Sequence, residues 1–130
     1  MNGIEKSSIL IVDDRPENLV ALEGQLESPA LNIVRASSGN EALGFMLKQD
    51  FALVLLDVQM PDMDGFETAE LMRSNERTEY IPIIFITAGS KSQEHVFKGY
   101  DSGALDYIFK PVDPYVLKSK IGRASCRERV

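Results

Sequence analysis

Short apolar runs alternate with helical patterns along the chain. Runs of four or five mostly apolar residues recur at positions 9–12, 32–36, 52–56, 83–86 and 106–109. Their length and their β-branched residues are typical of buried strands. The segments between them place apolar residues three or four positions apart, which is the spacing of one helix face. The alternation predicts a parallel α/β sheet with helices on both faces, because parallel neighbours need crossover connections and these are almost always right-handed.

The expected helices are located by their apolar stripes. The clearest stripe is in segment 16–26, where Pro16 suits a first helical turn and Asp14 or Arg15 precedes it. The stripes are formed by Leu19, Leu22 and Leu26; by Ala42, Leu43, Met46 and Leu47; by Phe66, Ala69 and Met72 after Gly65; and by Val96 and Phe97 in a shorter, weaker helix. A last helix is expected to begin near Asp113 and Pro114 and to run for about three turns.

The polarity of each run predicts its place in the sheet. Runs 9–12, 52–56 and 83–86 are continuously apolar, as expected of strands covered on both faces. Runs 32–36 and 106–109 contain polar residues, which suits the two edges. The resulting order is 2-1-3-4-5, that of a flavodoxin-like, doubly wound, five-stranded parallel sheet. In this order a ligand is expected at the carboxyl ends of the first and third strands, where the winding changes direction.

Acidic residues occupy that position. Asp13 and Asp14 follow the first run, and Asp57 follows the third. Two unit charges ~4 Å apart repel by roughly 4 kcal/mol at an effective dielectric near 20, so three clustered carboxylates need a cation or protons to coexist. Mg²⁺ is the simplest answer, because it prefers oxygen ligands, retains several waters and takes a further oxygen from a phosphate. The sequence therefore predicts a magnesium site directed at a phosphoryl group.

Each candidate residue also has a purely structural interpretation. Asp57 can attack phosphorus and hold the phosphoryl group as a mixed anhydride, or it can simply start a turn. Asp13 or Asp14 can cap the first helix, but only one residue can occupy the cap position. The hydroxyl of Thr87 and the ammonium group of Lys110 can bind a phosphoryl oxygen. Alternatively, Thr87 is simply a β-branched residue at a strand end and Lys110 is an ordinary surface lysine.

The neighbours of Thr87 and Lys110 suit a ligand site. Ala88 and Gly89 are small, which lets a ligand approach the backbone closely. Pro111 restricts Lys110 to an extended backbone and can form the cis bond of a tight turn. Four strand ends are therefore expected to contribute to one site.

Composition narrows the class of partner. The 130 residues fit one domain, and the net charge of -6 disfavours binding to nucleic acid or to an anionic membrane. The single cysteine, Cys126, excludes an internal disulfide and a cysteine zinc site. Residues 1–7 lack an apolar secretory core, and no apolar run approaches the ~20 residues that span a bilayer. These features indicate a cytoplasmic protein whose partners are proteins, without membrane attachment through this chain.

Taken in chain order, the motifs resemble a two-component response-regulator receiver domain. The matching residues are Asp13-Asp14, Asp57 with Met60-Pro61-Asp62-Met63-Asp64-Gly65 after it, Thr87-Ala88, and Lys110-Pro111. The resemblance covers about residues 8–121. Each piece is weak by itself, but the combination at these spacings is highly specific.

The resemblance implies a role for each site residue. Asp57 would accept a phosphoryl group from a histidine kinase or a phosphotransfer protein. Mg²⁺ would be held directly or through water by Asp13, Asp14, Asp57 and the main-chain carbonyl of Gln59. The protein would then be a switch and not an enzyme, catalysing only its own phosphorylation and dephosphorylation.

Further roles follow from the same resemblance. Thr87 and Lys110 would bind the phosphoryl oxygens. Tyr107 would be the switch aromatic that turns inward when Thr87 moves. The alternative is that Tyr107 is an ordinary tyrosine of an edge strand with no switching role. Gln59 and Gly89, two residues beyond Asp57 and Thr87, would tune the lifetime of the phosphate. The output face, and a possible homodimer interface, would be formed by the fourth helix, the fifth strand and the fifth helix.

The carboxyl-terminal residues depart from the pattern. The apolar stripe of the last helix stops at Gly122, so residues 1–121 are expected to form the receiver domain and residues 122–130 a non-native or disordered tail. The segment 13–18 looks like receivers of multidomain sensor kinases and cyclic-dinucleotide signalling proteins. His95, the only histidine, is expected to face solvent and is assigned no role.

Three rival interpretations remain open. A dehalogenase-like, Mg-dependent phosphatase also uses a strand-end aspartate, but it needs a second aspartate two residues on, where this chain has Gln59. A flavodoxin-type carrier shares the sheet, but Asp13 and Asp14 would repel the flavin phosphate. A degenerate receiver that serves only as a protein-binding module is disfavoured by the intact acceptor, metal pair, threonine and lysine.

Overall fold

Five parallel strands form one sheet in the part of the chain that the structure describes, residues 7–88 and 104–128 of a computed structural model. The strands are β1 (Ser7–Val12), β2 (Leu31–Ala36), β3 (Leu53–Asp57), β4 (Ile83–Thr87) and β5 (Ala104–Phe109). Their order is β2-β1-β3-β4-β5, and every neighbouring pair is parallel. The predicted flavodoxin-like order and both edge strands are confirmed. The helix expected around Val96 and Phe97 lies outside the described residues, as do Gly89 and His95.

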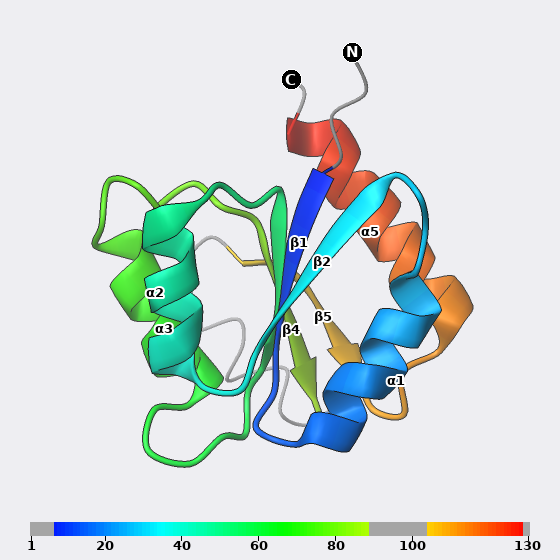
Figure 1. Cartoon of the computed structure of the whole chain (residues 1–130), viewed down its shortest axis with the longest axis horizontal. Coiled ribbons are helices and arrows are strands. Elements are labelled where there is room, and N and C mark those ends of the chain that lie inside the picture. The colour runs from blue at the N-terminus through cyan, green and yellow to red at the C-terminus, as the bar shows by residue number, and fades with distance from the viewer. Residues whose placement is uncertain (1–6, 89–103, 129–130) are drawn as a thin grey trace.

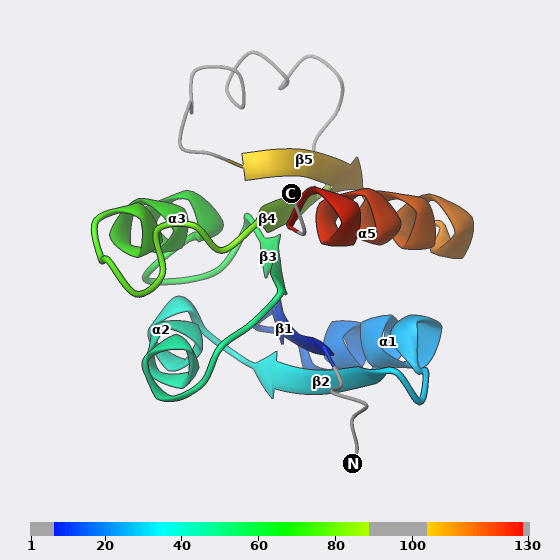
Figure 2. The same ribbon diagram turned by 90° about the horizontal axis from the view of Figure 1, so that it is seen from above.

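Helices cover both faces of this sheet. They are α1 (Pro16–Leu26), α2 (Gly39–Lys48), α3 (Gly65–Arg73) and α5 (Pro114–Glu128). Figures 1 and 2 show α1 and α5 on one face of the sheet and α2 and α3 on the other. No helix within residues 7–88 and 104–128 is long and apolar enough to cross a bilayer.

The core is divided into two layers by the sheet. Successive strand residues point to opposite faces, so Leu10 and Leu56 pack on the α2 and α3 side, whereas Ile11 and Leu55 pack on the α1 and α5 side. Each fully buried aliphatic side chain contributes roughly 1.5–3 kcal/mol. Burial on both faces explains why the central strands read as continuous apolar runs.

The three helix stripes that fall within the described residues are confirmed with one exception. Leu19, Leu22 and Leu26 of α1 are buried, and so are Ala42 and Met46 of α2. Leu47, assigned to the α2 stripe from its spacing, is 55% exposed. The row that contains Ala42 and Met46 faces the sheet, and a residue one position further on is turned about 100° away from that row.

The helix amino termini differ in how they are capped. Asp64 and Glu67 form a capping box at α3, and Ser38 accepts a hydrogen bond from the Glu41 amide at α2. At α1 the cap position is held by Arg15, whose side chain makes no capping hydrogen bond, and Pro16 follows it. The capping interpretation of the preceding aspartates is therefore wrong.

The end of the last helix also differs from expectation. The apolar stripe ends with Leu117 and Ile121, both buried, but α5 continues through Gly122 to Glu128. Arginine, alanine and glutamate favour the helix in this stretch, whereas one internal glycine costs only about 1 kcal/mol relative to alanine. α5 thus runs beyond residue 121, where the domain was expected to end. The assignment of residues 122–130 as a non-native or disordered tail stays a prediction.

Candidate functional site

Four strand ends meet at one edge of the sheet. Asp13 follows β1, Asp57 ends β3, Thr87 ends β4 and Lys110 follows β5. The sheet ladder extends beyond the strands, because the Lys110 amide donates to the Thr87 carbonyl at 2.7 Å and the Asp13 amide donates to the Ala36 carbonyl at 3.1 Å. These backbone hydrogen bonds hold Asp13 and Lys110 in register with the neighbouring strands and so set where their side chains project from the sheet.

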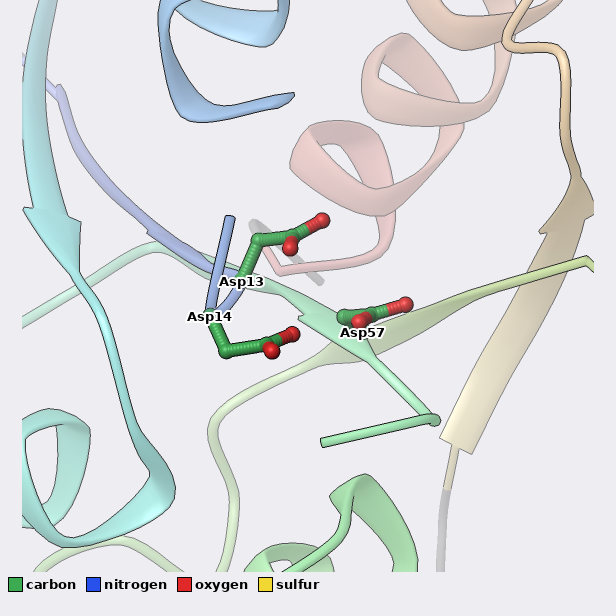
Figure 3. Close-up of side chains that lie close together, drawn as sticks. All are labelled: Asp13, Asp14 and Asp57. Carbon is green, nitrogen blue, oxygen red and sulfur yellow. The ribbon is translucent and has the colours of Figure 1, made fainter. Parts of the chain in front are cut away.

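Three carboxylates converge at this edge. One oxygen from each of Asp13, Asp14 and Asp57 lies within 4.8 Å of the other two. Figure 3 shows the three side chains projecting to the same side from the ends of β1 and β3. Asp13 and Asp57 are only 1% and 3% exposed, so most of their charge is removed from water. The predicted convergence is confirmed.

Lys110 bridges two of these carboxylates. Its Nζ atom lies 3.2 Å from Oδ1 of Asp57 and 3.7 Å from Oδ2 of Asp13. The peptide bond between Lys110 and Pro111 is cis, the alternative that the sequence left open. One ammonium group stands against three carboxylates, so the cluster keeps an excess of negative charge.

The environment of Asp57 disfavours its charged form. Burial, followed by the neighbouring Asp13 charge, raises the pKa of the Asp57 carboxyl to about 6, although the Lys110 ammonium acts in the opposite direction. Among the residues that the structure describes, Oδ1 of Asp57 finds no hydrogen-bond donor, although Lys110 is within ion-pair distance. This buried oxygen is a ready position for a further cation or a reacting group.

Asp13 is held in place by two hydrogen bonds. Its Oδ1 accepts from the Arg15 amide at 2.9 Å, and its Oδ2 accepts from Nδ2 of Asn18 at 3.0 Å. Asn18 lies in the first turn of α1, where sequence reasoning gave it no role. Its position five residues after Asp13, just inside a helix, was the only available signal.

The loop after β3 is held close to the end of that strand. The Gly65 amide donates to the Val58 carbonyl at 3.0 Å, and a Cβ atom on Gly65 would lie 2.9 Å from Cα of Val58 and closer still to the Asp57 carbonyl. Asp62 has φ 66°, and the Met63 amide donates to the Pro61 carbonyl around it. The chain therefore turns sharply at Asp62. Gln59 is exposed in this loop, and the role of its carbonyl stays a prediction.

Thr87 and Tyr107 lie on the β4 and β5 side of the site. Thr87 is 1% exposed and pairs with Phe109, whereas Tyr107 pairs with Phe85 two residues earlier in the same register. The Tyr107 ring packs edge-on against Phe109, with centroids 5.4 Å apart. Tyr107 is partly buried against the core layer of α2 and α3. Its use as a switch stays a prediction.

The donor set fits Mg²⁺. All three side chains offer carboxylate oxygens, the ligand type that this ion prefers, and Oδ1 of Asp57 lacks a hydrogen-bond partner within the described chain. Ligand oxygens at 2.0–2.1 Å from an ion stand at most about 4 Å apart across it. The three oxygens lie within 4.8 Å of one another, which is close enough to hold one ion directly or through a retained water.

Comparisons with known proteins agree with this arrangement. The model of the family "Response regulator receiver domain" matches residues 9–122. A Vibrio cholerae protein named "Probable cyclic di-GMP phosphodiesterase" is 40% identical over 121 residues, which are 93% of this chain and 27% of that protein. "Transcriptional regulatory protein SrrA" of Staphylococcus aureus is 39% identical over 108 residues, which are 83% of this chain and 43% of that protein. The chain thus spans less than half the length of these relatives.

A solved structure supports the same assignment. The response regulator receiver domain protein (CheY-like) from Methanospirillum hungatei JF-1 is similar with a TM-score of 0.84 and 30% sequence identity, covering 96% of this chain and 98% of that one. The match of the family model to residues 9–122 covers most of the chain, including all four strand ends of the site. This chain belongs to the response regulator receiver domain family of two-component systems.

Proposed function

We propose that this chain is a phosphoacceptor switch in which Asp57 takes a phosphoryl group from a histidine kinase or a phosphotransfer protein. The observation that carries the proposal is the setting of Asp57, which is buried at a strand end between two carboxylates and one lysine. Such a carboxylate is destabilised as an anion, and esterification by a phosphoryl group changes its charge and its contacts together.

Mg²⁺ is the cofactor proposed for this step. Asp13, Asp14 and Asp57 would hold it, together with the main-chain carbonyl of Gln59. When bound, the ion supplies charge neutralisation and a binding position for one phosphoryl oxygen. The two hydrogen bonds to Asp13 orient its carboxylate in the absence of the ion.

The residues of this chain account for the transfer itself. An oxygen of Asp57 attacks phosphorus as the bond from phosphorus to the donor nitrogen breaks, and the nitrogen keeps the electron pair of that bond. Lys110, already 3.2 Å from Asp57, binds one phosphoryl oxygen as a charge-assisted hydrogen-bond donor. The Thr87 hydroxyl at the adjacent strand end donates to another.

The proposed output is a change of conformation around Thr87 and Tyr107. A shift of the population from 1:99 to 99:1 needs ~5.5 kcal/mol of preference, which several charge-assisted hydrogen bonds can supply. We place the output face, and a possible homodimer interface, on β5, α5 and the fourth helix predicted from the sequence. The controlled element is an output domain or a separate partner, with the switch acting in the cytoplasm.

An enzymatic role is not needed to explain the site. The named activities of the relatives belong to proteins more than twice as long as the matched segment. A dehalogenase-like phosphatase would need an acid where Gln59 stands, and Gln59 cannot donate and recover a proton as a carboxyl group does. We therefore propose that the chain catalyses only its own phosphorylation and dephosphorylation.

Acetyl phosphate tests this function. We expect incubation with acetyl phosphate and Mg²⁺ to add one labile phosphoryl group, measured as intact mass. Asp57→Asn should abolish the addition, and Asp50→Asn is a matched control because the Asp50 side chain is 96% exposed. Steady hydrolysis of unrelated phosphate esters would favour the phosphatase instead, and no addition at all would favour a binding module.

A further inference from the structure

The connections around the site carry far more negative than positive charge. In the described part of the chain, the connections after β1, β2, β3 and β5 are residues 13–15, 37–38, 58–64 and 110–113. Their acidic residues are Asp13, Asp14, Asp62, Asp64 and Asp113, and their basic residues are Arg15 and Lys110. Asp57 adds a further carboxylate at the end of β3. A phosphoryl group, itself nearly doubly negative, is therefore repelled from this edge unless cations offset the charge.

The two basic residues of these connections differ in their surroundings. The Nζ atom of Lys110 forms ion pairs with Asp57 and Asp13. The side chain of Arg15 is exposed, and it makes no ion pair or hydrogen bond with the described residues. The Lys110 charge is thus already engaged by two carboxylates of the site, whereas the Arg15 charge is open to a ligand that approaches from solvent.

The start of α1 does not explain an arginine at position 15. Arg15 holds the cap position with an extended backbone, φ -103° and ψ 117°, but its side chain makes no capping hydrogen bond. Serine, threonine, aspartate and asparagine stabilise this position because their short side chains accept from the first free amides, which arginine cannot do. Pro16 already favours the first helical turn. The arginine side chain therefore needs another explanation.

The backbone of Arg15 is anchored beside the acidic cluster. Its amide donates to Oδ1 of Asp13 at 2.9 Å, and its carbonyl accepts from the amides of Asn18 and Leu19 at 3.0 and 3.3 Å. The preceding residue, Asp14, contributes an oxygen to the cluster. The arginine side chain therefore starts from a fixed point at the rim of the site, while its exposed guanidinium group stays free to move.

We propose that Arg15 binds the phosphoryl group of an incoming phosphodonor before its transfer to Asp57, an inference that rests on the function proposed above. The planar guanidinium group presents paired N–H donors that match two oxygens of a phosphoryl group. An exposed cation at the rim of an acidic site also raises the local concentration of an anionic donor. Because the contact is made to the phosphoryl group, an acyl phosphate and a phosphorylated imidazole are bound in the same way.

Charge variants at position 15 test this proposal. Phosphorylation is followed by intact mass at saturating Mg²⁺ and low ionic strength, with acetyl phosphate and phosphoimidazole as separate donors. We expect the second-order rate constant to fall about fivefold in Arg15→Gln and about 20-fold in Arg15→Glu with both donors, and to stay within about twofold in Arg15→Lys. Added salt should narrow these differences, because it screens an exposed charge.

Two controls separate donor binding from a structural role. Lys48→Gln removes the same charge from an exposed residue in the last turn of α2, at the other edge of the sheet, and should change the rate by less than about 1.5-fold. The dissociation constant for Mg²⁺ is the second control. Because the Arg15 charge repels a metal ion, Arg15→Gln should bind Mg²⁺ as tightly as wild type or more tightly, although it reacts more slowly with the donors.

Three outcomes would overturn the proposal. Equal rates in wild type and Arg15→Gln would mean that the donor does not contact this residue. Weaker Mg²⁺ binding in Arg15→Gln would mean that Arg15 acts through the metal ligands. A slower reaction with only one donor would place the contact on the leaving group. No labelling of wild type by either donor would instead refute the proposed function itself.

Discussion

At the scale of single residues, the central feature is a carboxylate held where its charge is costly. The pKa of Asp57 is raised to about 6 by burial and by the Asp13 charge, against the opposing effect of Lys110. The folded state therefore binds a proton more tightly than the unfolded chain does. Between about pH 4 and pH 6 the free energy of unfolding falls as the pH rises. Above about pH 6 the folded protein carries the full destabilisation caused by the ionised Asp57 carboxylate. Asp57 thus weakens the fold at neutral pH in the absence of metal.

Asp57→Asn should stabilise the metal-free protein. At about pH 7.5 we expect the free energy of unfolding to rise by about 1–3 kcal/mol, with the gain disappearing near pH 4, because the proton is then bound in both states. Urea titrations at several pH values measure this difference, with Asp50→Asn as an exposed control expected within about 0.5 kcal/mol of wild type. Addition of Mg²⁺ should reduce the gain, since only wild type keeps the third carboxylate. A variant less stable than wild type at neutral pH would show that Asp57 is satisfied without a cation.

Asn18 is the residue whose function only the structure shows. Its amide fixes Oδ2 of Asp13, and loss of a partner that orients a ligand typically weakens metal affinity 10- to 100-fold. Asn18→Ala should therefore bind Mg²⁺ about tenfold more weakly while the protein stays folded. The dissociation constant measures the effect, with Glu17→Ala as the neighbouring exposed control. Unchanged affinity in Asn18→Ala would mean that the Arg15 amide alone orients Asp13.

At the scale of elements, the last helix departs most from what the sequence suggests. Its apolar stripe ends at Ile121, yet α5 runs on to Glu128, through a stretch in which alanine, arginine and glutamate are good helix formers. A periodic stripe predicts which residues are buried and does not by itself fix where a helix stops. The exposure of Leu47 has the same explanation. Its spacing places it within α2, but its side chain is turned away from the row that faces the sheet.

Gly122→Ala distinguishes a continuous helix from one that ends at the glycine. Apart from its chain neighbours and the backbone of its own helix, no atom of the described residues lies within 4 Å of the added Cβ, and alanine is preferred to glycine by about 1 kcal/mol inside a helix. The substitution should therefore raise the free energy of unfolding by about 0.5–1 kcal/mol, as should Gly44→Ala inside α2, which is equally open. A loss of stability in Gly122→Ala together with a gain in Gly44→Ala would mean that the helix ends at residue 122.

At the scale of the whole molecule, the sheet order and the position of the site could be predicted because both follow from strand polarity and direction. Continuous apolar runs fixed the central strands, and in a parallel sheet the residues after those strands must meet at one edge. The backbone positions of Asp13, Asp14, Asp57 and Lys110 therefore lie at one edge of the sheet, whereas the distances between their side-chain atoms also depend on the rotamers. The contact of Asn18 with Asp13 could not be predicted in this way, since it depends on how α1 is set against β1.

The charge of the site links these scales. Three carboxylates and one lysine leave a net negative charge at the strand ends. The proposed ion and phosphoryl group would change this charge at the place where β3, β4 and β5 end together. A change at Asp57 therefore acts directly on Lys110, whose Nζ atom lies 3.2 Å away, and Thr87 ends the neighbouring strand β4. This is the physical basis for proposing that the outcome of phosphorylation is read at β5 and α5.

Mapping of the phosphorylated residue tests the central claim most directly. After incubation with acetyl phosphate, with and without Mg²⁺, proteolysis and tandem mass spectrometry locate the label. The account predicts one phosphoryl group on Asp57, formed only with Mg²⁺ and released by hydroxylamine as an acyl phosphate. Label on His95 or a hydroxyl residue, or equal labelling of Asp57 without Mg²⁺, would contradict it.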